Sequence, residues 1–188
     1  MLQKEQKSKI ILGLDPGTQV MGYGVIEQRG STMVVLQMGV LHLEKYKDHF
    51  LKLKKIHETV IRVISEYLPD EVAIEAPFYA KNVQSMLKLG RAQGVAVAAA
   101  LSRDVPVHEY LPKKVKMSVT GNGNASKEQV AAMLQNLLNF TETPEFLDAT
   151  DALAVAVCHH FQGKVPVSKT TSWKAFLAEN PKRVKRNW

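Results

Sequence analysis

The sequence has a single cysteine, Cys158, which excludes an intrachain disulfide bond. It has no apolar run long enough to cross a bilayer, and its first residues, MLQKEQKSK, are polar rather than typical of a secretory signal. We therefore expect a reducing, cytoplasmic location and no membrane partner. Acidic residues are scarce relative to basic ones: 18 Asp and Glu against 25 Lys and Arg give a formal charge of +7. This excess indicates a polyanionic partner, most simply a nucleic acid.

The length of 188 residues and the hydrophobic share of 45% are typical of one globular domain. Residues 1–8 are a polar extension, and residues 9–162 carry all the periodic patterns and form the expected domain. Residues 163–188 are polar and basic. We expect them to be a loosely ordered tail that carries most of the net charge.

The chain is organised around residues 10–26, IILGLDPGTQVMGYGVI. Its first five residues are almost wholly apolar, which favours a central strand covered on both faces. Pro16 and Gly17 end this strand, because Pro presets φ and Gly accepts positive φ. Asp15 is thereby placed at the end of the strand, exposed on a rigid support.

The remaining patterns predict an α/β domain. Strands at 21–27 and 32–43 follow the first strand through short links, which indicates an antiparallel meander. Apolar residues at helical spacing predict helices at 48–68 and 83–101, and capping and proline signals predict helices from 112, from 126 to 138 and from 143 to 161. Short strands at 70–75 and 105–110 follow helices, so a crossover makes the 70–75 strand a parallel partner of the first strand.

Four carboxylates come from three of these elements: Asp15 and Glu75 end neighbouring strands, and Asp148 and Asp151 share one face of the last helix. Each has a simpler interpretation, as a turn residue or as charge near a helix N-terminus. Together they form a cluster of like charges with no obvious basic partner. Oxygen ligands select Mg²⁺ or Mn²⁺ rather than zinc, and two such ions assist attack of water on a phosphodiester.

Four stretches resemble the RuvC family of Holliday junction resolvases, in the ribonuclease H-like superfamily. They are ILGLDPGTQVMGYGVI, VAIEAPFYAKNVQSMLKLGRAQGVAVAAA, VHEYLPKKVKMSVTGNGNASKEQV and DATDALAVAVCHH, in the family's order and spacing. The resemblance implies a ribonuclease H-like α/β fold with a five-stranded mixed sheet flanked by helices. It also implies a homodimer that resolves Holliday junctions in recombination and DNA repair, by paired symmetric nicks with 5′-phosphate and 3′-hydroxyl ends.

The family's metal-binding catalytic set falls on four residues of this chain, namely Asp15, Glu75, Asp148 and Asp151. Some members carry His where Asp148 stands. The resemblance implies two Mg²⁺ per active site, with Mn²⁺ as a substitute, and a four-way DNA junction as the substrate. It further implies the branch-migration complex of RuvA and RuvB as a partner, and a bacterial, nucleoid-associated location.

Outside the carboxylates, Phe78 matches the family's aromatic that stacks on an unpaired base near the junction. Lys116 and Lys127 match lysines that contact DNA phosphate or support cleavage, and the segment of Gly90 and Gly94 matches the dimer-forming region. Charge alone places a further group on the same DNA face, namely Lys81, Lys88 and Arg91. Three histidines are expected to be structural or to face solvent, namely His108, His159 and His160.

Two other interpretations stay open on the sequence. DPGT before a glycine-rich strand also resembles the phosphate loop of actin-like ATPases, which need a second domain, and of YqgF-type nucleases, which would move the substrate towards RNA. The second interpretation is a junction-binding protein that has lost catalysis. The stretch from Lys113 to Val130 argues against the YqgF-type interpretation, and four intact carboxylates argue against lost catalysis.

Overall fold

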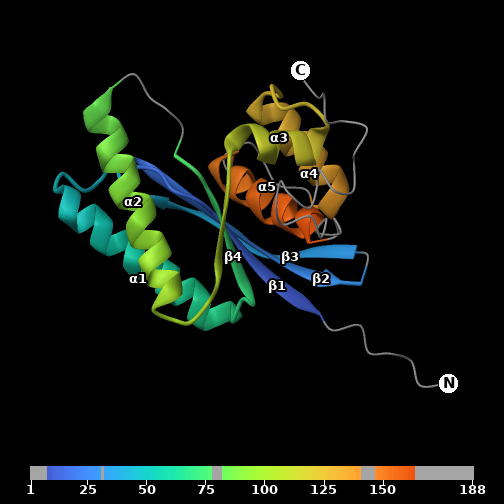
Figure 1. Ribbon diagram of the computed structural model, residues 1–188, viewed down its shortest axis with the longest axis horizontal. Coiled ribbons are helices and arrows are strands. Elements are labelled where there is room, and N and C mark those ends of the chain that lie inside the picture. The colour runs from blue at the N-terminus through green and yellow to red at the C-terminus, as the bar shows by residue number, and fades with distance from the viewer. Residues whose placement is uncertain (1–7, 31, 78–81, 141–146, 164–188) are drawn as a thin grey trace, which may run out of the picture.

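The computed structural model describes residues 8–30, 32–77, 82–140 and 147–163. Its centre is a five-stranded sheet in the order β3-β2-β1-β4-β5 (Figure 1). The strands are β1 (Lys9–Asp15), β2 (Val20–Arg29), β3 (Thr32–His42), β4 (Glu71–Glu75) and β5 (Val107–Tyr110). The first three pair antiparallel, whereas β4 pairs parallel with β1 and β5 pairs parallel with β4. The predicted mixed sheet is confirmed.

Helices cover both faces of the sheet. On one face lie α1 (His49–Tyr67) and α2 (Val83–Leu101). On the other lie α3 (Pro112–Thr120), α4 (Lys127–Leu138) and α5 (Leu147–Gln162), as Figure 1 shows. All five helices match predictions, although the expected start of the last one, at 143, lies outside the described residues. The predicted tail after 163 also lies outside them, as does all but Ser8 of the predicted N-terminal extension.

Alternate side chains of β1 enter two separate cores. Leu12 and Leu14 pack with the buried faces of α1 and α2, whereas Ile11 packs with α3, α4 and α5. Successive strand residues point to opposite faces, so a strand covered on both sides must be apolar throughout. The apolar run at 10–14 has this cause, and it holds β1 rigidly at the centre of the sheet.

The helix ends follow from local chemistry. The Asp48 side chain accepts a hydrogen bond from the Leu51 N–H at 2.7 Å and so caps α1. Pro112 occupies the first turn of α3, where a missing N–H costs nothing. Ser126 and Gln129 form the predicted capping box at the start of α4. This box fixes where α4 begins and therefore where the next residue, Lys127, leaves the backbone.

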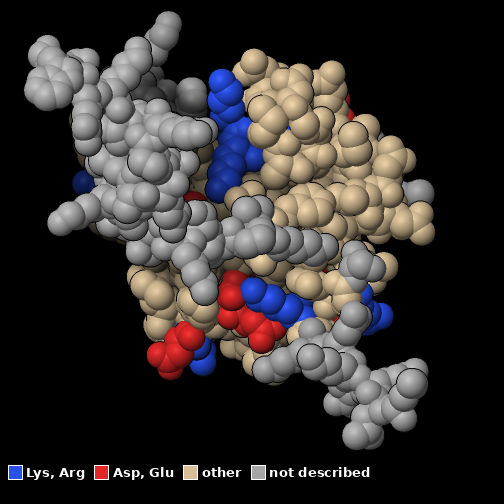
Figure 2. Space-filling model, turned by 45° about the vertical axis from the view of Figure 1, so that its right-hand side comes forward, with Lys and Arg blue, Asp and Glu red and all other residues tan. Residues whose placement is uncertain are grey.

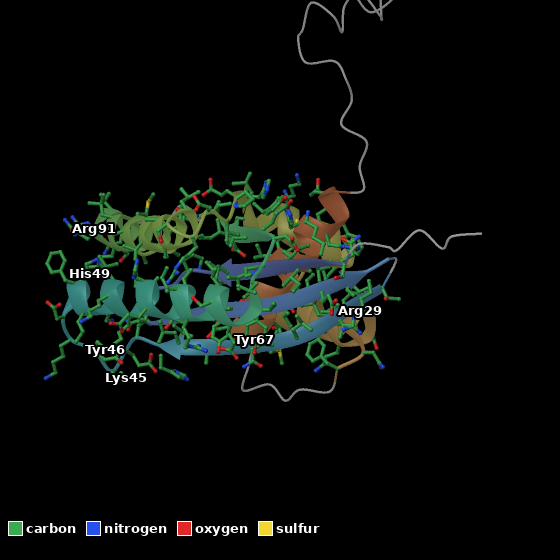
Figure 3. The ribbon with its side chains drawn as sticks, turned by 90° about the horizontal axis from the view of Figure 1, so that it is seen from below. Arg29, Lys45, Tyr46, His49, Tyr67 and Arg91 are labelled. Atoms are coloured by element: carbon green, nitrogen blue, oxygen red, sulfur yellow. The ribbon has the colours of Figure 1, made fainter. Side chains whose placement is uncertain are left out.

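The tip of the β2–β3 hairpin and the first residue of α1 lie at opposite ends of the molecule. In Figure 3, Arg29 at the tip of β2 lies at the opposite end of the molecule from Lys45, Tyr46 and His49. Among the described residues, no helix is both long enough and apolar enough to cross a membrane.

Candidate active site

Asp15 and Glu75 lie at the same end of the sheet. The parallel register pairs Leu14 with Ile74, so the residue that follows each of them ends its strand beside the other. The crossover connection and the parallel pairing of β1 with β4 thus bring together two carboxylates that are sixty residues apart, as predicted. Asp15 is half-buried rather than exposed, which corrects the expectation from the sequence. The cause is that α5 packs over the end of β1.

Two glycines allow α5 to approach the sheet at backbone distance. A Cβ added at Gly13 would lie 2.1 Å from the Ala152 carbonyl oxygen, and one at Gly22 would lie 2.0 Å from the Asp148 carbonyl oxygen. Any side chain at these positions would force the helix away. The glycines in the first two strands therefore bring the start of α5, with its two aspartates, over the end of β1.

Lys127 holds the two aspartates of α5. Its Nζ lies 2.5 Å from Asp151 Oδ2 and 3.2 Å from Asp148 Oδ1. The expectation that the carboxylates have no basic partner is therefore wrong for this half of the cluster. Sequence reasoning missed the pair because Lys127 stands 21 positions before Asp148, and only the packing of α4 on α5 brings them together.

A pocket of about 230 Å³ joins these groups. Its polar lining consists of Asp15, Glu75, Asp151, Lys116 and Lys127. A second hollow of about 120 Å³ touches the same Asp15 and Glu75 on the side of α2, where Gln93 also lines it. Asp148 lies beside the pocket and joins the site through Lys127. Three of the four predicted carboxylates thus share one cavity, and the fourth is adjacent to it.

Burial and mutual repulsion favour the protonated form of two of these carboxyl groups. Burial, with added repulsion from Glu75 and Asp151, raises the pKa of Asp15 to about 8. Burial and the Asp151 charge raise the pKa of Glu75 to about 7. Burial also raises the pKa of Asp151, although Lys127 counteracts this effect. The raised pKa values of Asp15 and Glu75 therefore mark a desolvated site in which neighbouring carboxylates repel one another.

This donor set fits a hard divalent cation. Carboxylate oxygens converge from β1, β4 and α5, and oxygen ligands suit Mg²⁺ or Mn²⁺. Desolvation of Lys127 lowers its pKa, but the two aspartates outweigh this and raise it, so the ammonium stays charged where it rests. An ion that binds Asp151 must therefore share this carboxylate with Lys127 or displace it.

The other predicted site residues are dispersed. Lys116 lines the pocket and donates a hydrogen bond from Nζ to the Ala125 carbonyl oxygen at 2.7 Å. Phe78 and Lys81 lie outside the described residues. Gly90 and Gly94 lie on the exposed side of α2, where an added Cβ would meet nothing within 4 Å.

Charged groups of both signs meet on the molecular surface. On the face shown in Figure 2, acidic side chains gather in one patch and contact basic side chains. The charge excess of the sequence is therefore not spread as a uniform basic surface over the described part of this face.

Comparison with known proteins places these features in a family. The model of the RuvC family, described as crossover junction endodeoxyribonuclease, matches residues 11–159. A crossover junction endodeoxyribonuclease RuvC of Cytophaga hutchinsonii is 64% identical over 178 residues, covering 94% of this chain and 88% of the relative. These matches do not favour the alternatives of an actin-like ATPase, a YqgF-type nuclease or a junction-binding protein without catalysis.

Solved structures agree with this placement. Thermus thermophilus RuvC in complex with Holliday junction substrate has a TM-score of 0.76 and 32% identity, covering 82% of this chain and 94% of that one. The yeast mitochondrial Holliday junction resolvase Ydc2 has a TM-score of 0.58 and 13% identity, covering 81% and 83%. The latter likeness concerns the fold alone.

Proposed function

Because this chain belongs to the RuvC family of crossover junction endodeoxyribonucleases, we propose that it resolves four-way DNA junctions by metal-dependent hydrolysis at the pocket of Asp15, Glu75 and Asp151. The observation that carries the proposal is the convergence of these carboxylates from β1, β4 and α5 in one cavity beside two lysines. Burial and mutual repulsion raise the pKa values of Asp15 and Glu75, and bound cations would favour their charged, metal-ligating form.

Three pocket carboxylates, with Asp148 beside them, are the proposed ligands of two Mg²⁺ ions, for which Mn²⁺ substitutes. Such ions, when bound, lower the pKa of a water and stabilise the attacking and leaving oxygens of an in-line displacement. The chain itself does three things. The rigid ends of β1 and β4 orient Asp15 and Glu75, the capping box of α4 positions Lys127, and the cavity admits only a limited number of waters. The proposed products carry 5′-phosphate and 3′-hydroxyl ends.

Two lysines at the pocket are suited to the DNA strand that is cut. Lys116 and Lys127 both line the cavity, and the side chain of Lys127 is half exposed. We assign them to phosphate contacts next to the carboxylates, where each positive charge offsets phosphate repulsion. Phe78 follows Glu75 by three positions, and we assign it to stacking on an unpaired base, with Lys81 on the same face.

The exposed face of α2 is suited to a homodimer. Its buried side is made by Ala92, Ala96, Ala99 and Ala100. The opposite side exposes Val83, Leu87 and Leu101, in line with the bare backbone of Gly90 and Gly94. An apolar stripe with small residues at its centre permits two helices to pack closely, and its exposure to water is unfavourable. A dimer would present two cavities to the two strands of one junction.

A dimer of this kind is tested by charge insertion. Leu87→Glu should shift the protein from dimer to monomer in sedimentation velocity, because it buries a charge in the contact. Gln84→Glu, an exposed position of the same helix outside the stripe, is the matched control and should leave the dimer intact. An unchanged sedimentation coefficient for Leu87→Glu would place the dimer contact elsewhere.

We further assign the protein to the bacterial cytoplasm and nucleoid, with RuvA and RuvB as partners.

Cleavage is tested on a synthetic four-way junction labelled on each strand in turn. With Mg²⁺ we expect paired nicks at symmetric positions that a ligase seals, and with Ca²⁺ binding without cuts. Asp15→Asn should keep junction binding and lose cleavage, whereas Asp48→Asn, which retains the helix cap on α1, should cleave normally. Cutting of RNA instead, or cleavage by Asp15→Asn at the normal rate, would contradict the proposal.

A further inference from the structure

A second cluster of potential metal ligands lies at the far end of β4 from the pocket. It consists of Glu71, His108 and His159, and we call it the histidine cluster. Each of the three offers one ligand atom, and these atoms all lie within 4.8 Å of one another. Glu71 begins β4 and Glu75 ends it, so the two sites are separated by about 13 Å of strand. The histidine cluster is therefore distinct from the carboxylate pocket.

The ligand atoms of the three side chains lie close to one another. Glu71 Oε2 contacts His159 Nε2 and lies 3.5 Å from His108 Nε2. The two imidazole rings lie 4.6 Å apart, centroid to centroid. His159 is buried, whereas the side chain of His108 is 45% exposed, so the cluster is closed on the side of α5 and open to solvent on the side of β5.

We propose that the histidine cluster binds one borderline transition-metal dication, of which Zn²⁺ is the representative. Two imidazole nitrogens and one carboxylate oxygen are a ligand set that suits Zn²⁺, Co²⁺ or Ni²⁺ and disfavours Mg²⁺. Bonds of about 2.0–2.1 Å in a tetrahedron place ligand atoms about 3.3 Å apart. The distance of 3.5 Å from Glu71 Oε2 to His108 Nε2 already has about this size.

A hydrogen bond behind the cluster supports this assignment. Tyr110 Oη lies 2.6 Å from His159 Nδ1, the ring nitrogen that faces away from Glu71. Without metal, His159 Nε2–H donates to Glu71 and Nδ1 accepts from the tyrosine hydroxyl. With metal, the proton moves to Nδ1 and is donated to the same hydroxyl, while Nε2 binds the ion. A hydroxyl can serve as donor or as acceptor, so Tyr110 accommodates both tautomers and fixes the ring in both.

Lys9 opposes metal binding. Its Nζ lies 2.7 Å from Glu71 Oε1, the carboxylate oxygen that the histidines leave free. This ammonium neutralises Glu71 when no ion is present, which explains how the cluster remains stable without one. It also repels an incoming dication, so Lys9 and the metal compete for one carboxylate. Removal of Lys9 should therefore strengthen metal binding, whereas removal of a ligand should weaken it.

The ion would join β5 to two elements that also build the carboxylate pocket, β4 and α5. Glu71 lies on β4, His108 on β5 and His159 in the last part of α5, whereas Glu75 and Asp151 occupy the other ends of β4 and α5. Metal at the histidine cluster would hold the base of this assembly together. Its role is structural, because none of its ligands lines the pocket.

The test is a titration of the untagged full-length chain with Co²⁺, in excess Mg²⁺ to fill sites made only of oxygen ligands. We expect a visible d–d absorption band that saturates at one equivalent and is abolished by Zn²⁺. His108→Ala should weaken Co²⁺ binding by more than the roughly 10–100-fold that loss of an outer-shell partner costs. Tyr110→Phe should weaken it within that range, and Lys9→Gln should strengthen it by roughly tenfold.

The matched control is His42→Ala, because His42 ends β3 at the opposite edge of the sheet from β5 and forms an exposed His–carboxylate pair with Glu44, with Nδ1 and Oε1 2.9 Å apart. This variant should bind Co²⁺ as the original chain does. The proposal is overturned if no band appears, if His42→Ala abolishes the band, if His108→Ala leaves the affinity unchanged, or if Lys9→Gln does not tighten binding. None of these readouts depends on cleavage of DNA, so failure here is distinguishable from failure of the proposed nuclease function.

Discussion

Replacing Asp15 with Asn should stabilise the metal-free protein at alkaline pH. In the folded chain, burial beside Glu75 and Asp151 raises the pKa of Asp15 to about 8, against an ordinary value of 3.8. Between these values the native carboxyl keeps a proton that the unfolded chain has lost. Stability therefore falls as the pH rises from about 4 to about 8, because the unfolded state binds fewer protons over this range. Asn cannot ionise, so the variant escapes this loss.

The magnitude follows from the pKa. A rise from 3.8 to about 8 corresponds to about 6 kcal/mol at 1.36 kcal/mol for each pKa unit. Glu75 shares the repulsion and the pocket is open to water, so we expect a gain of about 2 kcal/mol at pH 8. The gain should shrink to about a third of this at pH 5, where the wild-type carboxyl is protonated in the fold.

Urea denaturation with a chelator present, at pH 5 and pH 8, measures the effect. Asp48→Asn is the control, since Asn caps a helix as well as Asp does, and it should change stability little. Adding Mg²⁺ at pH 8 should make the wild type more stable than Asp15→Asn, because the ion stabilises only a chain that binds it. A variant less stable than wild type at pH 8 without metal, or a difference that does not depend on pH, would refute the reasoning.

Three further changes test how the pocket is assembled. Lys127→Met leaves Asp151 without its cation and should cost about 1–2 kcal/mol at pH 8 in urea, with the loss disappearing below about pH 4. Ser126→Ala removes the α4 cap and should cost about 1 kcal/mol, whereas Ser126→Thr should restore most of it. Gly13→Ala should cost about 3 kcal/mol in thermal unfolding and also slow cleavage, because its Cβ would strike the Ala152 carbonyl. Gly94→Ala, with open space around its Cβ, should not destabilise the fold.

Local patterns predicted most of the fold because they report local causes. The Ser126–Gln129 capping box, Pro112 at the start of α3 and the apolar run of β1 act within a few residues. The crossover rule then placed β4 beside β1, and with it Glu75 beside Asp15. The four carboxylates were predicted as one site, although the structure puts Asp148 beside the pocket rather than in its lining.

What the sequence by itself determined is the order and type of the elements, the two faces of the central strand and the carboxylates at the ends of β1 and β4. Only the tertiary structure decided that Lys127 pairs with Asp148 and Asp151, that Asp15 is half-buried, and that Glu71, His108 and His159 converge. The physical reason is separation along the chain. These contacts join residues 21 to 88 positions apart, and their geometry depends on how closely α4 and α5 pack on the sheet. Neither hydrophobic periodicity nor motif spacing predicts how closely these helices pack on the sheet.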